Sequence, residues 1–146
     1  AAALQLVLDA RPDVLAHNLE TVPPRYRDVR PQADYARSLT LLRRSAAAGL
    51  ITKTGIMVGL GETPDEVHAV LRDAREAGCD IFTIGQYLQP SKAHHPVLAY
   101  IEPAVFDAYR AAGEAMGYGV VISAPLVRSS YHTEEQSRFL QQRLGR

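Results

Sequence analysis

Four short apolar runs that alternate with helical patterns restrict the folds open to this chain. The runs lie at 14–17, 52–58, 81–84 and 120–122. In the segments between them, apolar residues recur at the three- and four-residue spacing of a buried helix face. Strands that alternate with helices pair in parallel, through right-handed crossovers. The sequence therefore predicts an α/β fold with four parallel strands.

The loops that follow the four strands differ from the loops that precede them. The loops after the strands are rich in polar residues, glycine or proline, whereas the returning loops at 49–50, 78–80 and 117–119 are short and plain. In a parallel sheet, ligands bind at the carboxyl ends of the strands. This asymmetry predicts a functional site at that edge of the sheet.

The segment 55–62 ends the second strand, and residues 63–66 carry the pattern of a helix capping box. Gly59 and Gly61 allow the main chain to approach a ligand closely. With the Glu62 carboxylate, the amides of this turn could hold a nucleotide-like ligand; the alternative is an ordinary tight turn with a solvated acid. No Lys-Ser or Lys-Thr pair follows the glycines, so the segment is not a P-loop.

Asn18 and Glu20 follow the first strand and are expected on one side of the chain, because they are two residues apart. An amide and a carboxylate in this arrangement can hydrogen-bond a ribose diol. The alternative is that both are turn and surface residues.

Two further groups of residues are weaker candidates. His94 and His95 are adjacent, so their side chains point apart, and we interpret them as part of a surface loop rather than a metal site. The segment 128–132 contains two serines and a histidine. It lacks a Gly-x-Ser-x-Gly elbow, and His132 is too close in sequence to be the usual base, so a hydrolase site is not favoured.

Composition excludes several classes of protein. Sixteen basic and sixteen acidic residues cancel, so we expect neither a nucleic-acid nor a membrane partner. No apolar run reaches the length of a bilayer span, and the first residues lack a signal-peptide pattern. The single cysteine, Cys79, excludes a disulfide framework and a cysteine-rich metal site within this chain. We expect Cys79 to be a small buried residue and the protein to be cytoplasmic.

Taken together, these stretches resemble the lipoyl synthases, a family of radical S-adenosylmethionine enzymes. The matching motifs lie at 17–21, 55–62, 86–90 and 128–131, and the resemblance extends over about 14–135. It implies a partial β/α barrel and a sulfurtransferase activity. Enzymes of this family insert two sulfur atoms into an octanoyl chain on a lysine of a lipoyl-accepting domain. The lipoyl group forms after a 5′-deoxyadenosyl radical abstracts hydrogens at two carbons.

The resemblance implies which residues contact S-adenosylmethionine. Asn18 and Glu20 match positions near its ribose, and Tyr87 and Leu88 match a segment along its adenine. The residues of a glycine, apolar, glycine, acid pattern match the adenine-binding strand: Gly55, Met57, Gly59 and Glu62. The resemblance assigns no catalytic residue.

A serine pair matches the C-terminal family motif, in which a serine oxygen ligates an auxiliary iron–sulfur cluster. We assign this ligand to Ser129, with Ser130 as the alternative. A serine ligand is unusual among thiolates, and it would be easier to displace when that cluster is dismantled as the sulfur donor.

The chain departs from the family in its cysteines. The family holds two [4Fe–4S] clusters with two cysteine triplets, and Cys79 matches neither. The chain is therefore expected to be the C-terminal half of such an enzyme and to be inactive alone. Residues 1–123 would form the second half of the radical S-adenosylmethionine barrel, and 124–146 a C-terminal extension with the Arg-Ser-Ser-Tyr motif and a terminal helix. The first strand would then lack a neighbour, which predicts marginal stability or aggregation of the isolated chain.

The resemblance also implies partners. These are an octanoylated lipoyl carrier domain, such as an E2 subunit of a 2-oxoacid dehydrogenase or the H protein of glycine cleavage, and an electron donor such as ferredoxin or flavodoxin. Two alternatives stay open. One is a non-catalytic β/α domain that binds a nucleotide or a protein partner. The other is a different radical S-adenosylmethionine enzyme, against which the match at 128–131 argues.

Overall fold

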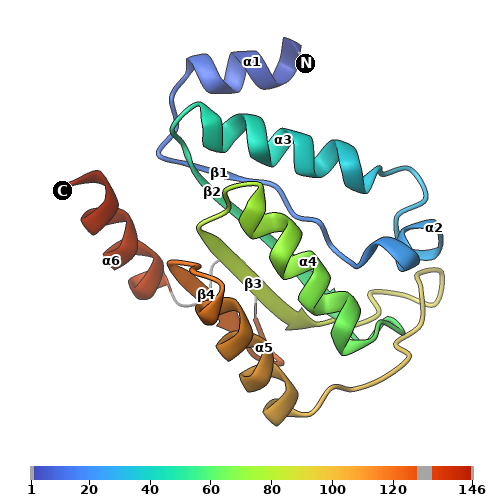
Figure 1. Cartoon of the computed structure of the whole chain (residues 1–146). Helices are drawn as coiled ribbons and strands as arrows, with labels where there is room; N and C mark the ends of the chain where they lie inside the picture. Colours follow the sequence, from blue (N-terminus) through green and yellow to red (C-terminus); the bar gives the residue numbers. More distant parts are fainter. Residues whose placement is uncertain (1, 128–132, 146) are drawn as a thin grey trace.

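The computed structural model describes residues 2–127 and 133–145. Its strands form one parallel sheet in the order β1-β2-β3-β4 (Figure 1). The strands are β1 (Val14–Ala16), β2 (Ile51–Val58), β3 (Ile81–Gln86) and β4 (Val120–Ser123). The helices are α1 (Ala2–Asp9), the 3-10 helix η1 (Pro23–Arg25), α2 (Tyr26–Val29), α3 (Tyr35–Ala47), α4 (Pro64–Glu76), α5 (Pro103–Ala115) and α6 (Thr133–Leu144).

The strand order follows the chain order, as in successive units of a β/α barrel. Within the described residues the sheet stays open, with β1 and β4 at its edges. The predicted α/β fold and partial barrel are therefore confirmed. None of the described helices is long and apolar enough to span a membrane.

The turn into α4 has the predicted capping box. Thr63 Oγ1 accepts a hydrogen bond from Glu66 N at 3.2 Å, and Thr63 N donates to Glu66 Oε1 at 2.8 Å. The helix ends before Gly78, whose φ of 102° suits a glycine C-cap. The buried stripe of α4 consists of Val67, Val70, Leu71 and Ala74. These signals fix where α4 begins and where it ends.

The main core lies between the sheet and the layer formed by α3, α4 and α5 (Figure 1). It joins Leu42 of α3 and Phe106 of α5 to Ile56 and Phe82 of the strands. Cys79 belongs to this core and is fully buried, as predicted. Each fully buried leucine, isoleucine or phenylalanine of this core stabilises the fold by about 1.5–3 kcal/mol.

The opposite face of the sheet is covered in part by α6. Phe139 and Leu140 of α6 pack on a smaller cluster that includes Ile51, Ile81 and Val120. These strand residues are at the amino-terminal ends of β2, β3 and β4. The carboxyl-terminal part of the same face carries a pocket.

Candidate functional site

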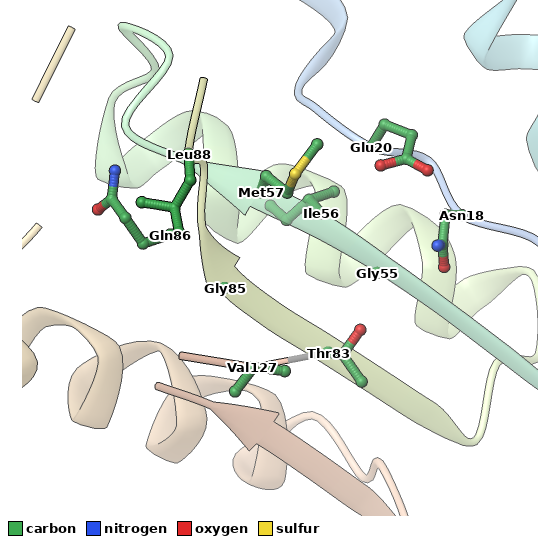
Figure 2. Close-up of a pocket in the computed structure, with 10 residues that line it drawn as sticks. All are labelled: Asn18, Glu20, Gly55, Ile56, Met57, Thr83, Gly85, Gln86, Leu88 and Val127. Carbon is green, nitrogen blue, oxygen red and sulfur yellow. The ribbon is translucent and has the colours of Figure 1, made fainter. Parts of the chain in front are cut away.

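A cavity of about 300 Å³ lies where β1, β2 and β3 end (Figure 2). It is lined by Asn18, Glu20, Gly55, Ile56, Met57, Thr83, Gly85, Gln86, Leu88 and Val127. Side chains alternate along a strand, so Gly55 and Met57 share the face of Ile51, away from α3, α4 and α5. The site therefore opens at the edge of the sheet that the loop pattern indicates.

Glycines form the floor of the pocket. Gly55 lies opposite Thr83 in the β2–β3 pair, and a Cβ at Gly55 would collide with Thr83 Oγ1. A Cβ at Gly85 would lie 3.0 Å from the Val127 carbonyl oxygen. Both glycines line the cavity, and Thr83 and Val127 occupy the space that a side chain at either position would need.

Asn18 and Glu20 form one wall, on a segment that continues β1 alongside β2. Glu20 N donates to Gly55 O at 3.0 Å, and Met57 N donates to Glu20 O at 2.9 Å. Leu19 between them is fully buried. In Figure 2 both polar side chains lie above the strand that carries Gly55 and Met57. An amide and a carboxylate are thus brought to one side of the floor.

Glu20 has an unusual main-chain conformation. Its φ is 71°, in the left-handed region that glycine and asparagine adopt more readily than glutamate. Among the described residues, Arg11, with a φ of 50°, is the other non-glycine residue of this kind. Strained residues of this kind cluster at binding sites.

Met57 and Leu88 supply apolar walls, whereas Tyr87 is turned into the following loop. The Tyr87 hydroxyl donates to the His95 carbonyl at 2.7 Å, and the Tyr87 side chain is buried. Tyr87 therefore organises the loop after β3 and does not line the cavity.

Gly59 and Glu62 build the turn beside the pocket and do not line it. The two Glu62 carboxylate oxygens accept from Gly59 N at 3.1 Å and from Leu60 N at 2.9 Å. Gly59 has a φ of 95°, and its carbonyl accepts from Leu98 N at 2.8 Å. The acid thus closes its own turn, and Gly59 fastens the turn to the loop after β3.

Gln86 is a pocket residue to which the sequence motifs gave no separate role. Its Nε2 donates to Tyr87 O at 3.0 Å and to Ala99 O at 2.9 Å, while its Oε1 accepts from Ile101 N at 2.9 Å. One side chain therefore fixes both ends of the loop from 87 to 101. The sequence signal is a polar residue at the end of an otherwise apolar strand. Sequence reasoning also assigned no role to Ile56, Thr83, Gly85 or Val127.

Lys53 lies two residues before Gly55 on the same face of β2 and is 7% exposed. Its Nζ donates to Gln136 Oε1 at 2.7 Å, which ties β2 to α6. Burial lowers the pKa of Lys53.

His17, His94 and His95 do not line the pocket. His17 Nε2 is 3.0 Å from Ser38 Oγ of α3. Burial lowers the pKa of His17, and Arg30 lowers it further, whereas Glu20 raises it. His94 and His95 are bonded within the loop after β3, to Ser91 and to the Pro96 carbonyl respectively.

The described residues include no group of three or more histidine, cysteine or acidic side chains placed to hold a metal ion. Burial raises the pKa of the Cys79 thiol to about 11. Ser129 and Ser130, the predicted cluster ligands, lie outside the described residues.

Comparison with known proteins identifies related chains. The family model of the radical SAM superfamily matches residues 1–85. A lipoyl synthase of Nitratidesulfovibrio vulgaris is 54% identical over 133 residues, which cover 91% of this chain and 45% of the relative. A lipoyl synthase of Oleidesulfovibrio alaskensis is 53% identical over 143 residues, covering 98% and 48%. One of Caldicellulosiruptor saccharolyticus is 52% identical over 140 residues, covering 94% and 49%. The chain thus spans about half the length of the curated relatives it matches.

Proposed function

The chain belongs to the radical SAM superfamily, and from this premise we propose that it is part of a lipoyl synthase. The whole enzyme would insert two sulfur atoms into a protein-bound octanoyl chain. The observation that carries the proposal is the identity of more than half of the aligned residues with proteins named lipoyl synthase, over nine-tenths of this chain. The superfamily implies S-adenosylmethionine and iron–sulfur clusters as cofactors.

The pocket fits the nucleoside part of S-adenosylmethionine. Asn18 and Glu20 would hold the ribose hydroxyls, because their amide and carboxylate groups line one wall. The main chain at Gly55 would lie against the flat adenine, with Met57 and Leu88 as apolar neighbours. Gly59, Glu62 and Tyr87 would support this wall through the turn and the loop. When bound, the cofactor supplies the group that abstracts hydrogen from the substrate.

The described residues do not fit an iron–sulfur cluster. Cys79 is buried in the main core, and its pKa is raised to about 11, whereas cluster ligands are thiolates. We therefore propose that the cysteine ligands of two [4Fe–4S] clusters belong to the part of the relatives that this chain does not span. Ser129, or alternatively Ser130, would be the ligand contributed from residues 124–146. The chain alone would then be inactive.

The partners follow from the same proposal. An octanoylated carrier domain, such as an E2 subunit or a glycine cleavage H protein, would present the acyl chain. A reductant such as ferredoxin or flavodoxin would supply electrons. We place the enzyme in the cytoplasm, where a buried free thiol such as Cys79 stays reduced.

The test uses the full-length parent protein, reconstituted anaerobically with iron and sulfide. We expect lipoyl product on an octanoylated H protein, measured by intact-protein mass spectrometry. Asn18→Ala should weaken S-adenosylmethionine binding, while His95→Ala, in the loop after β3 and outside the pocket, should not. If the parent cleaves S-adenosylmethionine but leaves the octanoyl chain unchanged, it is a different radical enzyme. If it binds no iron–sulfur cluster at all, the result favours the alternative of a non-catalytic β/α domain that binds a nucleotide or a protein partner.

A parallel measurement tests the chain by itself. We expect iron and sulfide assays on the isolated 146-residue chain to find no stoichiometric cluster. Two clusters per chain would contradict the proposed assignment of the ligands.

A further inference from the structure

We propose that Tyr26 and Arg30 are positioning residues for the cofactor: they hold the main chain of 18–20 and so set where Asn18 and Glu20 lie in the pocket. The inference rests on the proposed function, because it takes S-adenosylmethionine as the ligand. Neither residue lines the cavity, and no sequence motif described above contains them.

Two side chains from one short segment donate hydrogen bonds to consecutive carbonyl groups beside the pocket. The Tyr26 hydroxyl donates to Leu19 O at 2.5 Å. Arg30 Nη1 donates to the same oxygen at 3.1 Å and to Asn18 O at 3.2 Å. Hydrogen bonds from a charged donor are stronger than neutral ones. The carbonyl groups of the Asn18–Leu19 and Leu19–Glu20 peptides are therefore fixed from the α2 side.

The opposite side of the same segment is fixed by β2. Leu19 N donates to Thr54 Oγ1 at 3.2 Å, and the main chain of Glu20 exchanges hydrogen bonds with Gly55 and Met57. The segment is thus held between β2 and α2. Such two-sided restraint is what keeps Glu20 at its φ of 71°, a conformation that a free chain would leave.

Tyr26 and Arg30 are themselves held by contacts with the helical layer. The Arg30 guanidinium lies 5.6 Å from the centre of the Tyr26 ring, and the Tyr26 ring packs edge-on against Tyr35 at 5.7 Å. The Tyr35 hydroxyl donates to Asp73 Oδ2 of α4 at 2.8 Å. A continuous set of contacts therefore runs from α4 through α3 and α2 to the pocket wall. A side chain that only decorated a surface loop would lack this support.

The experiment measures S-adenosylmethionine affinity by equilibrium dialysis on the anaerobically reconstituted full-length parent. Arg30→Ala and Tyr26→Phe should each raise the dissociation constant about three- to tenfold, because each removes one or two hydrogen bonds to the segment. Arg27→Ala is the matched control, since Arg27 is an exposed arginine of α2, three residues before Arg30. Thermal unfolding of each variant accompanies the binding measurement. Tyr26→Phe keeps the ring and its packing, so it serves if Arg30→Ala does not fold.

A double-mutant cycle separates positioning from a general structural role. In a parent that already carries Asn18→Ala and Glu20→Ala, the Arg30→Ala change should no longer alter the affinity. An undiminished effect in that background would overturn the proposal, as would a wild-type dissociation constant for both single variants. A different pattern marks failure of the proposed function: Asn18→Ala and Glu20→Ala would then leave the affinity unchanged, and the positioning role would fall with the site.

Discussion

Gly55 and Thr83 face each other across β2 and β3 with no room for a Cβ between them. We expect Gly55→Ala to destabilise the chain by about 1–3 kcal/mol, because the new methyl group overpacks the strand pair. It should also weaken cofactor binding in the parent. Adding Thr83→Ala should restore part of the stability, because it removes the Thr83 hydroxyl. The recovery should be incomplete, because the Thr83 carbonyl would still lie 2.8 Å from the new methyl group. Urea unfolding measures the free energy of unfolding of the single and the double variant.

The contrasting variant for this prediction is Gly49→Ala. Gly49 has open space around its Cβ position but a φ of 90°. It should cost about 1 kcal/mol through the main chain alone and leave cofactor affinity unchanged. Equal binding defects in the two variants would show that the Gly55–Thr83 contact has no special role.

Glu20→Gly should separate stability from binding. Glycine tolerates the left-handed conformation, so the free energy of unfolding should rise or stay within about 1 kcal/mol of wild type. Affinity for S-adenosylmethionine should fall, because the carboxylate is lost. Arg11→Gly is the control: it removes a similar left-handed strain, at φ 50°, outside the pocket. A large loss of stability in Glu20→Gly would contradict the account of this residue.

Stability should fall in mildly acidic solution through His17. Its pKa in the folded chain lies below the ordinary 6.5, chiefly through burial. The unfolded chain therefore binds the proton first, so the contribution of His17 is complete above pH 6.5 and is lost as the pH falls through the folded pKa. Unfolding free energies between pH 8 and pH 5 should decline less steeply in His17→Gln. A wild-type slope in His17→Gln would contradict this account of the pH dependence.

Cys79 should be inert in the folded chain. Its thiol is fully buried and its pKa is raised to about 11, so thiolate-directed reagents at pH 8 should react only after unfolding. Cys79→Ala in the reconstituted parent should retain the iron content of the wild type, with a loss of about 1 kcal/mol or more from the cavity. Loss of iron in a folded Cys79→Ala protein would make it a cluster ligand after all.

Ser129→Ala in the parent should impair sulfur insertion while cleavage of S-adenosylmethionine survives. The reason is that the proposed serine ligand belongs to the auxiliary cluster, which supplies sulfur rather than the radical. Ser130→Ala is the comparison, and the serine whose loss changes the cluster spectrum is the ligand. Normal sulfur insertion in both variants, or loss of S-adenosylmethionine cleavage in Ser129→Ala, would contradict the assignment.

The strands and the glycine-capped helices were predictable because their signals are local. Ile51–Val58 and α4 follow from an apolar run, a capping box and Gly78. The end of β3 was predicted two residues early, at 84, because Gly85 and Gln86 do not look like strand residues. They pair with Met57 and Val58 of β2 all the same, and this pairing extends the strand.

The site residues were predictable only where they lie close in sequence to the carboxyl end of a predicted strand. Asn18, Glu20 and Gly55 fit that description, and the structure brings them together. The helix α2 and the role of Arg30 were not predictable, because they depend on main-chain contacts 11 and 12 residues away. For Glu62, the pattern predicted either a ligand-facing acid or a solvated one, and its local hydrogen bonds with Gly59 N and Leu60 N hold the carboxylate in its own turn.

The glycines at positions 55 and 85 of the pocket have a consequence for how this site can change over evolutionary time. A surface made of main-chain atoms offers no side chain to trim, enlarge or charge, and each glycine is held by what packs against it. Selection for a different ligand could therefore act only on the walls, chiefly at Asn18, Glu20, Met57 and Leu88. The part of the ligand that contacts the main chain at these glycines is therefore the part that substitutions can least easily accommodate in another form.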